Sequence, residues 1–277
     1  MSQDYKKIIQ REYLNCVKSP VHFMKKYCKI QHPTKGKIKF NLYDYQQEML
    51  TDFVDNRYNI ILKSRQLGIS TLSAGYSLWM MLFNQDKNIL VIAKDKDTAK
   101  NLVTKVRIMY ANLPQWLKTK VIEDNKLSLV FSNGSQIKAV AATAEAGRSE
   151  ALSLLVIDEA AFIDKIDSIW TAAQQTLATG GDCIALSTPN GVGNWFHQQW
   201  MGAVDGTNNF NTIKLHWTCH PERDNAWRAE QDKVLGPSQA AQECDADFLT
   251  SGESVVDPQI LTWYKENQVC EPVEKIG

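Results

Sequence analysis

Four short apolar runs, each followed by a polar or glycine-bearing segment, constrain the fold of this chain more than any other feature. The runs are residues 59–63, 88–93, 153–157 and 183–187. Continuous apolar runs of this length are typical of strands that are buried on both faces of a parallel sheet, with helices as the connections. Because such sheets bind ligands beyond the carboxyl ends of their strands, we expect functional residues in the segments that follow the runs.

Helical patterns and one hairpin fill the chain around these runs. A Ser-Asn-Gly-Ser turn between two alternating segments predicts a hairpin over residues 127–140, and a further strand is expected near residues 212–216. Residues 31–39, which include one proline and one glycine, are expected to form a polar connector. Helices are predicted at residues 5–17, 20–29, 43–55, 70–83, 95–113, 166–178, 192–201, 227–234 and 238–247.

Charge is balanced over the chain but not along it. The 277 residues carry 31 basic and 31 acidic side chains, so no chain-wide positive field marks a nucleic-acid binder. Residues 1–40 nevertheless hold ten Lys or Arg against two Asp or Glu. This basic segment is either a solvated helix face or a local site for a polyanion. Neither a membrane-spanning run nor a signal peptide is recognisable, so we expect a cytoplasmic protein with reduced cysteines.

The segment after the first run is similar to a phosphate-binding loop, with two departures. A P-loop reads G-x-x-x-x-G-K-[ST]. Gly68 and Ser70 match this pattern, whereas Lys63 stands at the first glycine and Ile69 stands at the usual lysine. The corresponding residues are Lys63, Ser64, Arg65, Gln66, Leu67, Gly68, Ile69 and Ser70, followed by Thr71.

A lysine at the start of the loop can replace the missing one. Backbone N–H groups of the loop and of the helix N-terminus supply most of a phosphate cradle, and the lysine adds a cation beside the β- and γ-phosphates. Lys63 can fold back over the same phosphates, and Arg65 offers a second cation. The alternative is that Lys63 only ends a strand while Ile69 packs a helix. We favour phosphate binding because Lys63 directly follows a buried run at the ligand edge of the sheet.

Two carboxylates, Asp158 and Glu159, end the third apolar run. In P-loop enzymes the aspartate at this place holds Mg²⁺ together with the loop hydroxyl, here Ser70. An adjacent glutamate can polarise the attacking water as a general base. An ordinary strand followed by an acidic helix cap is the alternative. The candidate phosphate loop upstream favours the catalytic interpretation.

Polar residues also end the fourth run and precede the third. Ser187 is the last residue of the fourth run, and Thr188 and Pro189 follow it. Such a triplet either senses the γ-phosphate and relays its loss or simply forms a turn. Arg148 lies in a loop before the acidic strand. It is either an arginine finger that reaches a neighbouring subunit's nucleotide or a solvated arginine.

Tyr45 and Gln46 precede the first run. They offer a ring that could stack on adenine and an amide that could read its edge. Alternatively, they belong to an amphipathic helix whose core face includes Tyr45.

The order of these motifs resembles that in the ATPase domain of the large terminase subunit of tailed bacteriophages, the DNA-packaging motor. The resemblance covers roughly residues 15–255. It implies an α/β P-loop NTPase fold of the ASCE/RecA-like type, with a mainly parallel central sheet flanked by helices and a small helical subdomain. We therefore expect an ATPase domain over residues 1–251, with a core at about 41–216 and the small subdomain at about 1–40 and 217–251, followed by a linker at 252–277.

The resemblance also implies roles for single residues. It assigns adenine binding to Tyr45 and Gln46, and the coupling of hydrolysis to movement to residues 187–189. Some members of the family place an arginine finger where Arg148 lies, and some carry their loop lysine at the start, as at Lys63. The resemblance also assigns Mg²⁺ binding to Asp158 and the general-base role to Glu159.

The function that the resemblance implies is Mg²⁺-dependent ATP hydrolysis that drives double-stranded DNA into a procapsid in the host cell cytoplasm. The implied partners are double-stranded DNA, the portal protein on which a homo-oligomeric ring docks, and the small terminase subunit, with no membrane. Full-length members continue into an RNase H-like nuclease domain. This chain ends at Gly277, before such a domain could fit, so we expect no nuclease activity from it.

Two other functions remain open at this point. A helicase-like DNA translocase shares the Tyr-Gln, Asp-Glu-Ala and Ser-Thr-Pro elements, but it needs a second motor domain that residues 217–277 are too few to form. A non-hydrolysing protein that assembles on ATP would explain the missing loop lysine. It would have no use for the water-polarising carboxylate of Glu159.

Overall fold

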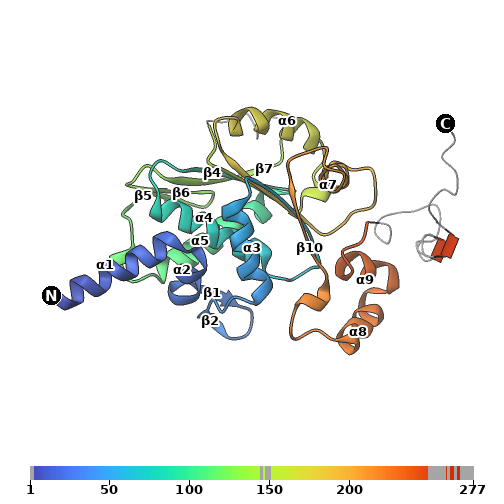
Figure 1. The fold of residues 1–277 in the computed structure, drawn as a ribbon, viewed down its shortest axis with the longest axis horizontal. Coiled ribbons are helices and arrows are strands. Elements are labelled where there is room, and N and C mark those ends of the chain that lie inside the picture. Colours follow the sequence, from blue (N-terminus) through green and yellow to red (C-terminus); the bar gives the residue numbers. More distant parts are fainter. Residues whose placement is uncertain are drawn as a thin grey trace.

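One large sheet contains all four predicted parallel strands. The computed structural model describes residues 3–143, 146, 151–248, 260, 263–264 and 267–268. The strands of the large sheet are β3 (Tyr58–Lys63), β4 (Asn88–Ala93), β5 (Val121–Asn125), β6 (Ser128–Phe131), β7 (Gln136–Ala141), β8 (Leu154–Asp158), β9 (Asp182–Ser187) and β10 (Asn211–Leu215). Their order is β10-β3-β9-β8-β4-β7-β6-β5 (Figure 1). All pairings from β10 to β7 are parallel, and the β7-β6 and β6-β5 pairings are antiparallel.

Helices cover both faces of this sheet. Figure 1 shows one group below the sheet and a second group above it, with two short helices beside the β10 edge. The lower group is α1 (Gln3–Lys18), α2 (Pro20–Tyr27), α3 (Asp44–Asp55), α4 (Ile69–Phe83) and α5 (Lys96–Ala111). The upper group is α6 (Ile166–Leu177) and α7 (Trp195–Val204), and the helices beside β10 are α8 (Asn225–Leu235) and α9 (Pro237–Cys244).

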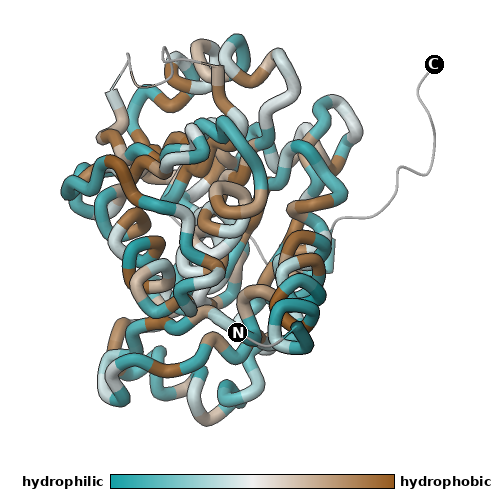
Figure 2. The backbone as a smooth tube through the Cα atoms, turned by 90° about the vertical axis from the view of Figure 1, so that its left-hand side faces the viewer, coloured by the Kyte–Doolittle hydropathy of each residue, from teal (hydrophilic) through white to brown (hydrophobic). Residues whose placement is uncertain are grey.

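The apolar runs are continuous because both faces of the central strands are buried. In β3 the side chain of Ile61 joins the core beneath the sheet, whereas Ile60 and Leu62 join the core above it. The same alternation holds in β4, β8 and β9. In Figure 2 hydrophobic residues gather in the interior of the molecule and hydrophilic ones along its outer loops. The predicted α/β class with a mainly parallel sheet is therefore confirmed.

Three expectations about local structure are wrong. Residues 31–39 do not form a simple connector, because β1 (Lys29–His32) and β2 (Gly36–Lys39) pair as an antiparallel hairpin and α2 ends earlier, at Tyr27. The exposed edge strand β5 was not expected, since its polar sequence lacks an apolar run. Helix α7 begins at Trp195 and not at residue 192, because the side chain of Asn194 caps it by accepting from the backbone N–H of His197 at 3.0 Å.

No helix among the described residues is both long and apolar enough to cross a membrane. The predicted linker at residues 252–277 lies almost wholly outside the described residues.

Candidate active site

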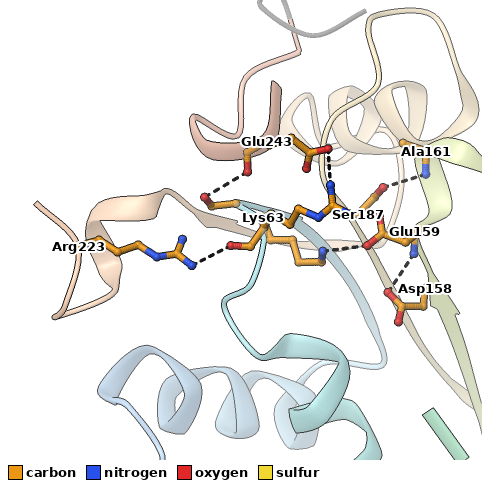
Figure 3. Close-up of polar contacts among 9 residues, drawn as sticks. Lys63, Asp158, Glu159, Ala161, Ser187, Arg223 and Glu243 are labelled. Atoms are coloured by element: carbon orange, nitrogen blue, oxygen red, sulfur yellow. Dashed lines mark hydrogen bonds and ion pairs between the residues drawn. The ribbon is translucent and has the colours of Figure 1, made fainter. Parts of the chain in front are cut away.

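The site lies at the carboxyl ends of three adjacent strands. Strand β9 pairs with β3 on one side and with β8 on the other. The residues that end these strands therefore meet at one edge, and Figure 3 shows Lys63, Asp158, Glu159 and Ser187 close together there. Sequence reasoning selected these residues from three separate segments, and the fold brings them together.

Lys63 and Glu159 form an ion pair across this edge. The Nζ atom of Lys63 donates to Oε1 of Glu159 at 3.3 Å (Figure 3). The lysine side chain is only 6% exposed, whereas the glutamate side chain is 33% exposed. Because a buried ammonium is costly without a partner, the lysine needs an anion at this place. The solvent-accessible Glu159 carboxylate is that anion, and another anion that enters from solvent can take its place.

The loop after β3 encloses a cavity of about 200 Å³ beside this pair. Gly68, with φ of +78°, is the residue before α4, and Gln66 also has a positive φ of 59°. A left-handed conformation at a non-glycine residue costs about 1–3 kcal/mol and often marks a functional site. Ile69 is among the residues that line the cavity, but it is only 2% exposed and packs in the core below the sheet. Position 69 therefore contributes no charge to the loop.

Asp158 lies beneath the pair and is 4% exposed. Burial raises the pKa of its carboxyl group, while the nearby Lys63 ammonium and a hydrogen bond from the Ser70 hydroxyl favour the ionised form. Its Oδ1 atom also accepts from the backbone N–H of Glu159 at 3.0 Å. A buried carboxylate beside a hydroxyl is an oxygen-only donor set of the kind that Mg²⁺ prefers.

The backbone at Glu159 is fixed by the end of β9. Glu159 has a φ of +54°, which is unusual outside glycine, and a short 3₁₀ turn (Ala160–Phe162) follows it. The backbone N–H of Ala161 donates to the hydroxyl oxygen of Ser187 at 3.1 Å. Ser187 and Thr188 are both buried. The predicted coupling triplet is thus bonded directly to the turn that carries the candidate general base.

Tyr45 and Gln46 hold the loop from below. The Tyr45 hydroxyl and the Gln46 side-chain amide both donate to the carbonyl oxygen of Leu67, at 2.9 and 3.0 Å. A Cβ atom at Gly68 would lie 2.9 Å from Nε2 of Gln46, so this close approach favours glycine. Both side chains are buried, which agrees with the helix-core interpretation. Adenine binding by the pair stays a prediction.

A second cavity, of about 540 Å³, adjoins the phosphate loop. Its walls are the β1-β2 hairpin, Tyr43, His220 and the part of the loop that includes Gly68. The rings of Tyr43 and His220 lie 4.7 Å apart, and Tyr43 stacks on Tyr45 at 5.7 Å. The two cavities share Gln66, Leu67, Gly68 and Thr71, so they flank one stretch of backbone.

A family of known proteins matches this arrangement. The family model of the terminase large subunit, T4likevirus-type, N-terminal, matches residues 60–272. This chain belongs to that family. The resemblance predicted from the motifs is thereby confirmed, and the chain is the N-terminal ATPase domain of a terminase large subunit.

Solved large terminases have the same fold. The ATPase domain of the Thermus phage P74-26 large terminase is 20% identical, with a TM-score of 0.62 over 76% of this chain and 94% of that one. The HK97 bacteriophage large terminase is 17% identical, with a TM-score of 0.67 over 84% and 55%. The large terminase of a thermophilic bacteriophage in complex with ADP is 14% identical, with a TM-score of 0.59 over 73% and 52%. The chain spans about half the length of the latter two.

Helix α9 and the segment before α8 brace the phosphate loop of this terminase domain, and sequence reasoning missed these contacts. The backbone N–H of Arg65 donates to the carbonyl oxygen of Glu243 in α9 at 2.7 Å, and the Arg65 side chain donates to the Glu243 carboxylate at 2.8 Å. Arg223 donates to the carbonyl oxygens of Arg65 and Gln66, at 3.0 and 3.2 Å. Arg65, predicted as a second phosphate cation, is thus paired with α9.

A further residue missed by the sequence reasoning is Lys105, which reaches the phosphate cavity from α5. Burial lowers the pKa of its ammonium group, and the Asp158 carboxylate opposes that shift. Lys105 lies three residues after Leu102 and four before Met109, beside the buried face of its helix, but this spacing does not predict that its ammonium reaches the phosphate cavity. The predicted arginine finger, Arg148, lies outside the described residues.

Arg223→Ala is expected to lower the free energy of unfolding by about 1–3 kcal/mol, because two hydrogen bonds from a charged donor to the loop are lost. The guanidinium also stacks on Trp227, 4.4 Å from the ring centre, and that contact is lost as well. Urea denaturation of both proteins measures the difference. Lys233→Ala, an exposed position on α8, is the control and should change stability by less than about 0.5 kcal/mol. Equal effects of the two substitutions would contradict the bracing role.

Proposed function

We propose that residues 63–71, Asp158 and Glu159 bind and hydrolyse ATP, and that hydrolysis drives double-stranded DNA into a procapsid. The observation that carries the proposal is the Lys63–Glu159 ion pair at the mouth of the phosphate-loop cavity. It joins the two groups that the chemistry requires, a cation for the triphosphate and a carboxylate for the water.

The residues present fit a magnesium ion. The Ser70 hydroxyl lowers the pKa of the Asp158 carboxyl group, so the two groups lie near each other beside the cavity, and both offer hard oxygen ligands. Mg²⁺ bound there would neutralise negative charge on the phosphates. We propose these two side chains as its protein ligands.

In the proposed reaction Lys63 exchanges one anion for another. A phosphate that enters the cavity competes with Glu159 for the ammonium, and the strong pull of a multiply charged phosphate favours the exchange. The released Glu159 carboxylate is then free to accept a hydrogen bond from water. The water oxygen forms a bond to the γ-phosphorus, the bond to the bridging oxygen breaks, ADP leaves, and the water proton passes to Glu159.

The proposed coupling runs through β9 and α9. Ser187 is bonded to the turn after Glu159, and the carbonyl oxygen of Pro189 accepts from the side chain of Gln242 at 3.2 Å. The next residue, Glu243, is bonded to the phosphate loop. Helix α9 therefore contacts both the segment after β9 and the phosphate loop after β3. We propose that loss of the γ-phosphate shifts these contacts and moves α8 and α9, which belong to the small subdomain of residues 1–40 and 217–251.

The proposed partners are double-stranded DNA, the portal protein, the small terminase subunit and further copies of the chain in a ring in the host cytoplasm. The basic segment at residues 1–40 is a candidate for contact with DNA or the portal. Arg148 is proposed as an arginine finger that acts on the neighbouring subunit's nucleotide.

ATP turnover by the purified chain, with and without duplex DNA, tests the proposal. We expect phosphate release in the presence of Mg²⁺ that falls to background when EDTA removes the metal and returns when Mg²⁺ is restored. Stimulation by duplex DNA supports a translocase. Tight ATP binding without any phosphate release would contradict the proposal and favour a non-hydrolysing assembly protein.

A further inference from the structure

We propose that Lys105 of α5 binds the terminal phosphate of ATP and supplies the charge that position 69 lacks. The inference rests on the proposed function, because it assigns a second phosphate-binding cation to the same site. Neither the P-loop pattern nor the carboxylate pair points to this residue, which lies 42 positions after Lys63 in the sequence.

The two cavities indicate which end of the nucleotide Lys105 meets. The larger cavity has room for a base and sugar, and it shares with the smaller one only the loop residues 66–68 and Thr71. Six residues line the smaller cavity alone: Lys63, Arg65, Ile69, Ser70, Lys105 and Glu159. A nucleotide laid over the shared backbone therefore places its terminal phosphate among these six.

The other cations at this end have partners, and the loop itself offers no replacement. Lys63 is paired with Glu159, and Arg65 is paired with Glu243 on the side of the loop that faces α9. Ile69 is packed in the core. Even with Mg²⁺ bound, an ATP triphosphate keeps a net negative charge that one lysine does not fully balance in a partly buried site.

Lys105 is placed where an incoming anion would compensate its burial. It is half-buried beside the buried face of α5, and among the described residues its ammonium forms no ion pair or hydrogen bond. The carboxylate that influences it is that of Asp158, which also interacts with Lys63 and Ser70. A partly buried ammonium without a close partner is unfavourable, and a phosphate oxygen in the cavity would satisfy it.

Binding of ATPγS and of ADP to the full chain, measured by calorimetry, tests this assignment. Lys105→Met keeps the aliphatic stem packed while it removes the charge. We expect it to weaken ATPγS binding at least about tenfold, as for one lost charge-assisted hydrogen bond, and to weaken ADP binding much less. Lys100→Met, on the exposed side of the same helix, should leave both affinities unchanged.

Two results would overturn the assignment. Unchanged ATPγS binding by a folded Lys105→Met chain would remove Lys105 from the phosphate site. An equal loss for ATPγS and ADP would indicate a structural effect on the loop. Because the test measures binding and not turnover, a chain that binds ATPγS but hydrolyses no ATP would contradict the proposed function without affecting the result for Lys105.

Discussion

Lys63→Ala is expected to abolish nucleotide binding or turnover. The Lys63 ammonium is the buried cation at the mouth of the phosphate cavity, and its Glu159 partner is accessible enough to give way to a phosphate. Removing this charge leaves the triphosphate repelled by Glu159 and Asp158 at the same edge of the sheet. Calorimetric binding of ATPγS and phosphate release from ATP, measured on the same preparation, check the result.

Position 69 provides the matched control for Lys63. Ile69 occupies the place of the usual P-loop lysine, but its side chain is in the core. Ile69→Ala is expected to leave the catalytic machinery in place while it destabilises the fold by about 2–5 kcal/mol. Ile69→Val, at about 0.5–1.5 kcal/mol, is the gentler variant for kinetic work. If the position-69 variants lost nucleotide binding while folded and Lys63→Ala kept it, the relocated-lysine hypothesis would be wrong.

Large parts of the fold could be predicted because the strands that form the sheet are buried on both faces. Burial on both faces leaves a continuous apolar run, and four such runs gave β3, β4, β8 and β9. The β1-β2 hairpin and β5 escaped prediction for the same physical reason. Their residues alternate between exposed and half-buried or are mostly exposed, so no apolar run marks them. Their pairing depends on neighbours in space.

The residues of the site also divide into those that could be predicted from the sequence and those that could not. Residues that end buried strands, such as Lys63 and Asp158, could be found because the topology of parallel sheets collects strand ends at one edge. Arg223, in the segment before α8, and Glu243 in α9 contact the phosphate loop from parts of the chain that are distant in sequence, and Lys105 in α5 lines the phosphate cavity. Such contacts are set by how helices pack, and no local pattern records them. For Tyr45 the sequence contained a local motif, but the motif did not predict that the Tyr45 hydroxyl would donate a hydrogen bond to the phosphate loop.

Glu159→Ala is expected to lower ATP turnover at least about 100-fold, the lower end of the effect of removing a general base. Glu159→Gln is the more informative variant. It keeps an oxygen that can accept from Lys63 Nζ, so the geometry at the mouth of the cavity is preserved while proton acceptance is lost. Nucleotide affinity should not fall in either variant, because neither removes a phosphate-binding cation and both remove a negative charge that competes with the phosphate for Lys63.

Glu243→Gln distinguishes loss of the base from a general disturbance of the loop. Glu243 also contacts the loop, but its backbone carbonyl makes the bond to the Arg65 N–H, and a glutamine leaves that carbonyl in place. Turnover should therefore fall far less than in Glu159→Gln. Single-turnover phosphate release with saturating ATP separates the chemical step from binding. Among the described residues that line the phosphate cavity, Glu159 is the one carboxylate. Near-normal turnover in Glu159→Gln would therefore mean that a residue outside this lining activates the water, and it would contradict the general-base role of Glu159.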